Sequence, residues 1–319
     1  MRGAALGAIC TLLLGACGDG VEGRIDAIRA SGRRYVHGEG LVRFDGGPAT
    51  RSIATQLRED KNARALLDAG ESAVPSLIRL LKDPERRTLA ATLLAEIGGN
   101  GAARELMTTW RSLRDSAKEK RILLPVGSGS FALGYRYEGV DDGFYGEVIM
   151  ALGYAGGPVS GEIAKDTEVA MTESERLAAK GDELLFREER VEDGRKVELV
   201  WSAAPVETAR EGLKLLAMLR APEAPSLFAR ALRSPVPALR CTAVQEIPFL
   251  GDAANGLLPA LGPLLDDPDL RADAVEQVTL LLEDGAPTEA VPVHHLSGEQ
   301  QAAVAVRCKE RLRELGHLR

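Results

Sequence analysis

Apolar residues recur at helical spacing along most of the chain, and the clearest case runs from Glu71 to Gly98. The first helix of this pair has its apolar stripe at Val74, Leu77, Leu80 and Leu81, and the second at Leu89, Leu93, Leu94 and Ile97. Asp83-Pro84 separates the two, since proline disfavours a helical conformation in the residue before it and suits the first turn of the next helix. One such pair cannot cover both of its faces, so the segment predicts similar pairs stacked beside it.

The same periodicity predicts helices in most other parts of the chain. They are expected at residues 21–30, 52–57, 63–67, 102–124, 144–154, 206–219, 224–233, 238–250, 256–265, 270–282 and 297–315. The last of these has Ser297 and Gln300 in the positions of a capping box, and Gly316 follows its end. With 45% apolar but only 4% aromatic residues, the composition favours closely packed helices over a β-sandwich.

Three stretches have strand patterns instead. Residues 34–46 predict a small hairpin or an extended loop, and residues 131–137 alternate between large apolar or aromatic side chains and other residues. Asp193-Gly194 is a strong turn signal between two β-prone runs, which predicts a hairpin with strands near 185–191 and 196–202. The rest of 157–205 is the least regular part of the chain. We therefore expect a mainly α protein with a small β-containing insertion.

The first residues have the pattern of a bacterial lipoprotein signal peptide. Arg2 supplies a positive charge, residues 4–14 are apolar, and Leu14-Gly15-Ala16-Cys17 follows. The apolar run is too short to span a bilayer but fits the core of a signal peptide. LGAC resembles the lipobox, which implies that Cys17 is lipidated and anchors the chain in the cell envelope, on the periplasmic or outer-membrane side. Gly18, in place of aspartate, offers no inner-membrane retention signal.

Charge and cysteine content add little to this picture. Without residues 1–16, which contain Arg2, 39 basic and 47 acidic side chains remain, so the formal net charge is −8. Such a surface repels nucleic acid and anionic headgroups, so we expect membrane attachment through lipid on Cys17 and no nucleic-acid partner. Cys241 and Cys308 either form a disulfide or are two small apolar side chains on helix faces.

The helix pairs repeat a pattern of specific residues. Residues 71–98 and 255–282 align without a gap, which pairs Pro75 with Pro259, Asp83-Pro84 with Asp267-Pro268, Arg87 with Arg271, and Ala90 with Ala274; residues 223–250 repeat Arg240 and Ala243 in the same relation. This arrangement resembles the HEAT repeat, particularly its bacterial HEAT-like form, over 71–115 and 206–283 and more weakly over 143–165. The resemblance implies a right-handed α-solenoid whose second helices line a concave face, and a protein-binding role.

The repeated residues also have a physical interpretation. The turn aspartate can cap the following helix, and the arginine can extend along it so that the guanidinium lies near a carboxylate of a neighbouring turn. The expected organisation is a signal peptide at 1–16, a tether and N-terminal cap at 17–60, HEAT-like repeats at 61–123, an irregular segment with a helix pair and the β-hairpin at 124–205, and HEAT-like repeats with a C-terminal capping helix at 206–319.

Catalytic and metal-binding motifs are not recognisable in the sequence. The four histidines include no H-E-x-x-H, and His294-His295 lies in a Pro-containing linker. Gly127-Ser128-Gly129-Ser130 lacks the lysine of a phosphate-binding loop. With no Ser/His or Cys/His constellation, the sequence predicts no enzyme activity, no cofactor and no metal.

Two sets of residues are candidates for protein binding. Aromatic residues gather between Phe131 and Tyr154, where Tyr135, Tyr137 and Tyr145 could form a contact surface, although a core for the β insertion is the favoured interpretation. Arg87, Arg240 and Arg271 lie on or near second helices and could edge the concave face.

The sequence supports three hypotheses about function. The first is a non-catalytic cell-envelope lipoprotein whose HEAT-like solenoid is a scaffold for an unidentified protein partner. The second is an enzyme or chromophore-handling protein of the lyase type, because HEAT-like repeats also occur in bilin lyases. In the third, the β insertion is the binding module and the helices position it.

Overall fold

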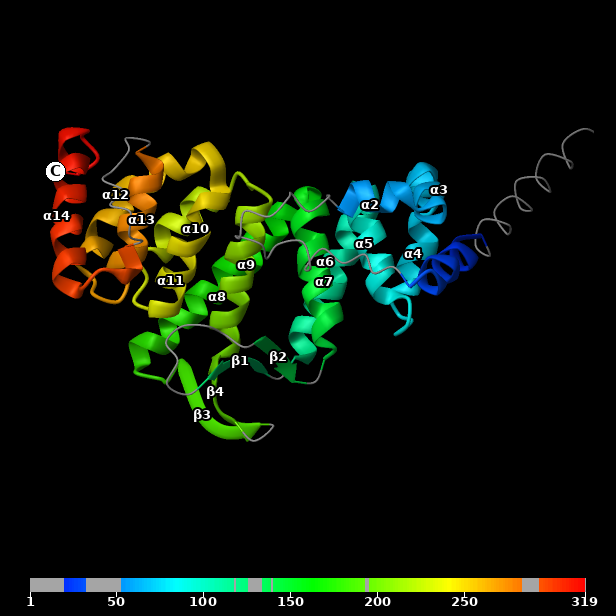
Figure 1. Cartoon of the computed structure of the whole chain (residues 1–319), viewed down its shortest axis with the longest axis horizontal. Coiled ribbons are helices and arrows are strands. Elements are labelled where there is room, and N and C mark those ends of the chain that lie inside the picture. Colours follow the sequence, from blue (N-terminus) through cyan, green and yellow to red (C-terminus); the bar gives the residue numbers. More distant parts are fainter. Residues whose placement is uncertain are drawn as a thin grey trace, which may run out of the picture. The chain divides into compact units, whose positions relative to one another are not determined.

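The structure is a computed structural model that describes residues 20–32, 53–117, 119–125, 134–138, 140–192, 195–282 and 293–318 (Figure 1). The chain forms two compact units. Unit 1 comprises residues 1–118 and 137–159, and unit 2 comprises residues 119–136 and 160–319. Cys17 and the strand pattern at 34–46 lie outside the described residues. No described helix combines the length and apolar character needed to cross a bilayer.

Unit 1 is helical. After a helix at 20–30 its elements are α2 (Ile53–Glu59), α3 (Lys61–Ala69), η2 (Gly70–Ser72), α4 (Val74–Leu80), α5 (Arg87–Ile97), α6 (Gly99–Ser116), α7 (Asp142–Ala155) and η3 (Gly157–Val159). Helix α5 packs against α4, α6 and α7, with the predicted stripe residues Leu93 and Leu94 fully buried. Arg86, in the turn before α5, donates to both carboxylate oxygens of Asp26 at 2.8 and 2.9 Å. These hydrogen bonds connect the helix at 20–30 to the α4–α5 pair.

Unit 2 contains the longest helix, a sheet and a series of shorter helices. Its helical elements are α8 (Ser160–Lys180), α9 (Ala204–Met218), α10 (Ala224–Ala231), α11 (Pro237–Glu246), η4 (Ile247–Leu257), α12 (Leu258–Leu261), η5 (Gly262–Asp266), α13 (Arg271–Leu281), η6 (Val293–His295) and α14 (Gly298–Glu314). Helix α9 packs against α8, α10 and α11, α11 packs against α13, and α13 packs against α14. The predicted capping box of α14 is confirmed, because Ser297 Oγ accepts from the Gln300 amide at 3.3 Å and Gln300 Oε1 accepts from the Ser297 amide at 2.9 Å.

The sheet has the strand order β2-β1-β4-β3, from β1 (Glu119–Pro125), β2 (Gly134–Glu138), β3 (Leu185–Glu192) and β4 (Arg195–Ser202). Strands β3 and β4 form the predicted antiparallel hairpin, in register from Leu185 opposite Ser202 to Glu192 opposite Arg195. Strand β1 pairs antiparallel with the other edge of β4. The protein is thus mainly helical with a small β part, as the sequence predicts.

Two predictions of secondary structure were wrong. The helix expected over 102–124 ends at Ser116, and residues 119–125 form β1. A short apolar run is compatible with a strand as well as a helix, and here the backbone of β4 provides the partner. The segment 157–205, expected to be irregular, contains the 21-residue helix α8. Its buried face includes Thr167 and Ser174, whose polar side chains weaken the apolar pattern.

Candidate functional site

Three neighbouring helices of unit 2, α9, α11 and α13, carry a row of polar side chains that we call the inner face of unit 2. It consists of Glu207, Arg210, Glu211 and Lys214 on α9, Cys241, Gln245 and Glu246 on α11, and Asp273 and Glu276 on α13. The opposite sides of the same helices hold core residues such as Leu213, Ala243 and Val275, all fully buried. Each of the three helices therefore contributes both core residues and polar residues.

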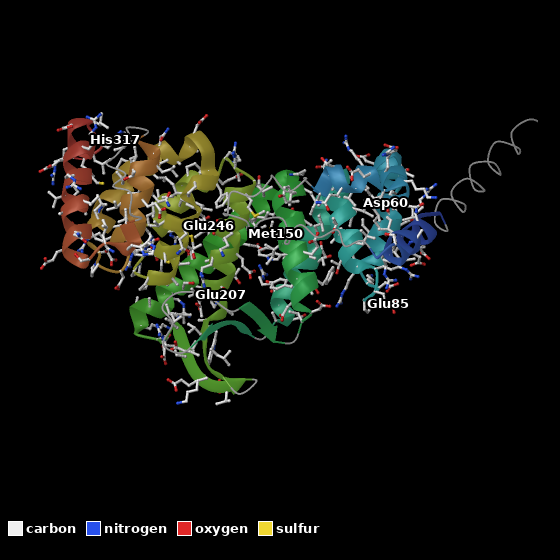
Figure 2. All side chains as sticks on the ribbon, in the orientation of Figure 1. Asp60, Glu85, Met150, Glu207, Glu246 and His317 are labelled. Carbon is white, nitrogen blue, oxygen red and sulfur yellow. The ribbon has the colours of Figure 1, made fainter. Side chains whose placement is uncertain are left out.

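A hydrogen bond and an ion pair connect α9 to α11 on the inner face. Arg210 donates to Glu207 Oε1 at 2.7 Å and to Thr242 Oγ1 on α11 at 2.9 Å. Lys214 Nζ lies 3.9 Å from Glu246 Oε1, which joins the same two helices one turn further on. Glu207 and Glu246 are labelled among the side chains in Figure 2. The arrangement holds the polar side chains in place on a rigid helical support.

Burial and excess negative charge shape the electrostatics of this face. Burial raises the pKa of Glu246, and Lys214 and Arg210 oppose that rise. Burial also raises the pKa of Asp273, and the nearby Glu276 carboxylate raises it further while His294 lowers it. Burial and Asp273 raise the pKa of the Cys241 thiol against Arg210 and Lys214, so groups from all three helices act on one another. Five carboxylates face two cationic side chains here, which makes the inner face acidic.

No protein-family model matches the sequence, and no curated protein matches it.

The three arginines predicted to edge a concave face are engaged in contacts that hold the fold. Arg87 donates to Asp141 Oδ2 at 2.7 Å, and its guanidinium lies 4.6 Å from the centre of the Phe144 ring. Asp141 itself caps α7 by accepting from the Phe144 amide, and that hydrogen bond and Arg87 lower its pKa against the effect of burial. Arg87 therefore joins the start of α5 to the start of α7 within unit 1.

Arg240 makes the corresponding link in unit 2. It donates to the Ser234 carbonyl at 2.9 Å and to Asp267 Oδ2, in the turn before α13, at 3.2 Å. This confirms the expected contact of the arginine with a carboxylate of a neighbouring turn. Arg271 instead donates to the carbonyls of Leu265 and Asp266 in its own turn, at 3.2 and 3.3 Å.

The turn aspartates do not cap the following helices, whose N-cap residues are Arg86 and Leu270, so this prediction was wrong. Asp83 accepts from the Glu85 amide at 2.9 Å, and Asp267 accepts from the Asp269 amide at 3.0 Å. These are Asx-type contacts two residues along the chain, so each aspartate stabilises the turn and not the first turn of the following helix. The two turns thus share the same hydrogen bond as well as the same residues.

The link between Arg240 and Asp267 is expected to contribute measurably to stability. Replacing Arg240 by alanine should lower the free energy of unfolding by about 1 kcal/mol, because both side chains are only about a fifth exposed and the guanidinium also bonds a carbonyl. A double-mutant cycle with Asp267→Ala, measured by urea unfolding, should give a coupling energy of about 0.5 kcal/mol or more. Additive effects of the two substitutions would contradict this link.

The aromatic candidates do not form a surface that the structure describes. Tyr145 is 2% exposed and belongs to the core of unit 1, so its ring does not face solvent. Tyr135 and Tyr137 lie on β2, whose side chains are outside the described part of the structure. Tyr154, on α7, is 57% exposed. The tyrosine contact surface therefore lacks support at Tyr145, because α7 turns that residue towards the core.

The two described cysteines are free thiols and do not form a disulfide. Cys308 is buried, whereas Cys241 is partly exposed on the inner face. The sequence left open either a disulfide between Cys241 and Cys308 or two small side chains on helix faces. The structure has the second arrangement.

One contact that the sequence analysis missed involves His294. Its Nε2 atom lies 3.3 Å from Asp273 Oδ1 and 3.5 Å from Glu276 Oε2. Asp273 and Glu276 are three residues apart and therefore share one side of α13. The acidic pair at this spacing was visible in the sequence, but no local signal placed His294, which is 18 residues or more away, beside it.

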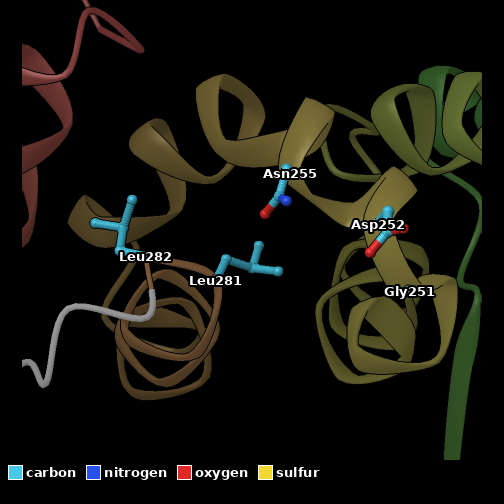
Figure 3. Close-up of a pocket in the computed structure, with 5 residues that line it drawn as sticks. All are labelled: Gly251, Asp252, Asn255, Leu281 and Leu282. Atoms are coloured by element: carbon cyan, nitrogen blue, oxygen red, sulfur yellow. The ribbon is translucent and has the colours of Figure 1, made fainter.

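A separate pocket of about 370 Å³ lies between η4 and the end of α13 (Figure 3). Leu281, Leu282 and Gly251 line it together with the side chains of Asp252 and Asn255, which are both exposed. Ligand pockets normally combine burial with a few convergent polar groups. Because the polar groups here face solvent, the inner face is the better candidate for a functional site.

Proposed function

We propose that this chain is a non-catalytic scaffold of the cell envelope, a HEAT-like solenoid that binds a cationic segment of a partner protein along the inner face of unit 2. The excess of carboxylates on α9, α11 and α13 carries this proposal. A segment rich in lysine and arginine would pair with Glu246, Asp273 and Glu276, and would relieve the repulsion between acidic groups that burial intensifies.

The recurrence of one helix-pair unit supports the solenoid part of the proposal. Asp83 and Asp267 make the same turn hydrogen bond, and Arg240 reaches from its own pair to the turn of the next. Stacked repeats need such contacts because each repeat is stabilised mainly by its immediate neighbours. An extended row of second helices also gives a partner segment several helices to contact at once.

The envelope location is proposed from residues 1–17 and rests on the LGAC sequence. Lipid on Cys17 would place the scaffold at a membrane without a basic surface, in keeping with the acidic composition. A tethered scaffold gains effective concentration for partners at the same membrane.

The charge of the inner face can be tested at Gln245. This side chain is exposed on α11, one turn after Cys241 and on the same side of the helix. Gln245→Lys should weaken binding of a cationic partner segment by about tenfold, because it places a like charge in the centre of the face. Gln245→Glu should strengthen binding by several-fold, and added salt should reduce the difference.

The partner segment can be identified with a photo-crosslinking residue at position 245 in intact cells. Ser226, which is exposed on α10, provides the matched control position. We expect peptides with a net positive charge from position 245 and none of them from position 226. Crosslinked peptides that are neutral or acidic, or equal affinities of the Lys and Glu variants for the captured segment, would contradict the proposal.

The sheet remains an alternative binding module, favoured by one observation. Strand β3 is the last strand of the sheet and exposes Leu185 and Val191, at 43% and 67%. The sheet can be tested by deletion. Deleting the whole segment 125–205 would also remove α8, which packs against α9, so a smaller deletion is needed. Ala203 N donates to Leu184 O at 3.0 Å, so the hairpin at 185–202 can be excised between these residues. Loss of partner binding in this hairpin deletion, with binding unchanged in the inner-face variants, would favour the sheet as the binding module.

A further inference from the structure

Three side chains at one end of the inner face bring potential metal ligands together. His294 Nε2, Asp273 Oδ1 and Glu276 Oε2 come from η6 and α13, and the ligand atoms of this triad all lie within 4.8 Å of one another. The two distances from the imidazole nitrogen are 3.3 and 3.5 Å. One nitrogen and two carboxylates thus converge on a common point in space.

An ion pair alone accounts poorly for this convergence. Nε2 carries at most one hydrogen, and one N–H donates well along only one direction, yet two carboxylates lie at similar distances from it. In a tetrahedral zinc site with bonds of about 2.0–2.1 Å, neighbouring ligand atoms are about 3.3 Å apart. The two separations from Nε2, 3.3 and 3.5 Å, are close to those of ligands that share one small cation, and all the ligand atoms lie within 4.8 Å of one another.

We propose that His294, Asp273 and Glu276 form a binding site for a divalent first-row transition metal, for which Zn²⁺ is the best-suited probe. An imidazole with two carboxylates is a mixed nitrogen and oxygen donor set, which suits zinc and its neighbours better than calcium or magnesium. Three protein ligands leave at least one position for water. The ion would join η6 to α13 and neutralise the acidic end of the inner face.

The three side chains of the triad differ in their exposure to solvent, and the more exposed ones leave the site accessible. Asp273 is held most firmly, with 21% of its side chain exposed, while the side chains of His294 and Glu276 are 50% and 60% exposed. Asp273 and Glu276 project from the same side of a regular helix, so their relative positions are set before a metal arrives. The more exposed side chains of His294 and Glu276 settle on the ion, while Asp273 is already partly buried. This inference does not depend on the proposed partner.

Isothermal titration of Zn²⁺ into the full chain, purified in detergent without an affinity tag, tests the site. The wild-type protein should bind one equivalent at this site, and His294→Ala and Asp273→Asn should each weaken that event by more than about tenfold. His295→Ala is the matched control, since this neighbouring histidine is also exposed but is not part of the triad. It should bind zinc as the wild type does.

A spectroscopic measurement removes ambiguity from other zinc-binding groups in the chain. Co²⁺ should give visible absorption bands of a low-symmetry four- or five-coordinate site in the wild type and in His295→Ala, and these bands should be absent in His294→Ala. Circular dichroism of each variant confirms that the fold is retained. Absence of saturable zinc binding to the wild type, or equal binding by His294→Ala and wild type, would overturn the assignment. Neither result would bear on the charge test at Gln245.

Discussion

Gly212→Ala is expected to destabilise unit 2 even though alanine is the better helix former. A Cβ atom added at Gly212 on α9 would lie 2.0 Å from Thr167 Oγ1 and 2.9 Å from Thr167 Cβ on α8. Thr167 is fully buried, β-branched and bonded through its hydroxyl to the Ile163 carbonyl at 2.7 Å, so it cannot readily move away. Overpacking costs about 1–3 kcal/mol against a gain in helix propensity of about 1 kcal/mol. We expect a net loss of up to about 2 kcal/mol in urea unfolding.

Two further variants make the Gly212 experiment decisive. Gly146, inside α7, has open space around an added Cβ, so Gly146→Ala should stabilise unit 1 by about 0.5–1 kcal/mol. Thr167→Ala removes Oγ1 and Cγ2, two of the three atoms nearest the added Cβ, and combined with Gly212→Ala it should recover part of the loss. If Gly212→Ala were as stable as the wild type, or if Thr167→Ala gave no rescue, the close approach of α8 and α9 would be refuted.

Cys17→Ala should move the protein from the membrane fraction to the soluble fraction almost completely. Each methylene of an acyl chain buried in the bilayer contributes about 0.8 kcal/mol, so several chains on one residue make a firm anchor. The apolar run at 4–14 is too short to replace it as a bilayer span. Incorporation of an alkyne-labelled fatty acid should be lost together with sedimentation at the membrane.

Cys10→Ala provides the matched control for this experiment. Cys10 lies within the apolar run and is not the lipobox cysteine, so its replacement should leave both labelling and membrane association unchanged. Fatty-acid labelling of Cys17→Ala at the wild-type level would rule out lipidation at this residue.

Helix positions were predictable where local signals agreed with one another. The stripe from Val74 to Ile97, with proline in the turn and glycine at the end, predicted α4 and α5 because period, start and stop signals coincided. Asp193-Gly194 predicted the β3–β4 hairpin for a similar reason, since turn chemistry and alternation pointed to the same structure. The repeated arginine also predicted a contact with a carboxylate of a neighbouring turn, which Arg240 makes with Asp267.

Other elements depended on partners that are distant in sequence. Residues 119–125 have a run of apolar residues that suits a helix or a strand, and pairing with β4 decided the outcome. Helix α8 was missed because its buried face uses threonine and serine, whose hydroxyls bond carbonyls four residues back and so require no apolar pattern. For Tyr145 the sequence left a contact surface and a core for the β insertion both open, and the packing of α7 placed its ring in the core of unit 1.

The candidate site, like the fold, has features that the sequence determined and features that only the tertiary structure decided. By itself the sequence determined the helix pairs, their turns, the hairpin and the excess of acidic residues, because each depends on residues within a few positions of one another. The tertiary structure alone decided that α9, α11 and α13 form one polar face, that His294 lies beside Asp273 and Glu276, and that Gly212 lies against Thr167. Those contacts join residues far apart in the chain, and their geometry follows from how whole helices pack and not from any local preference.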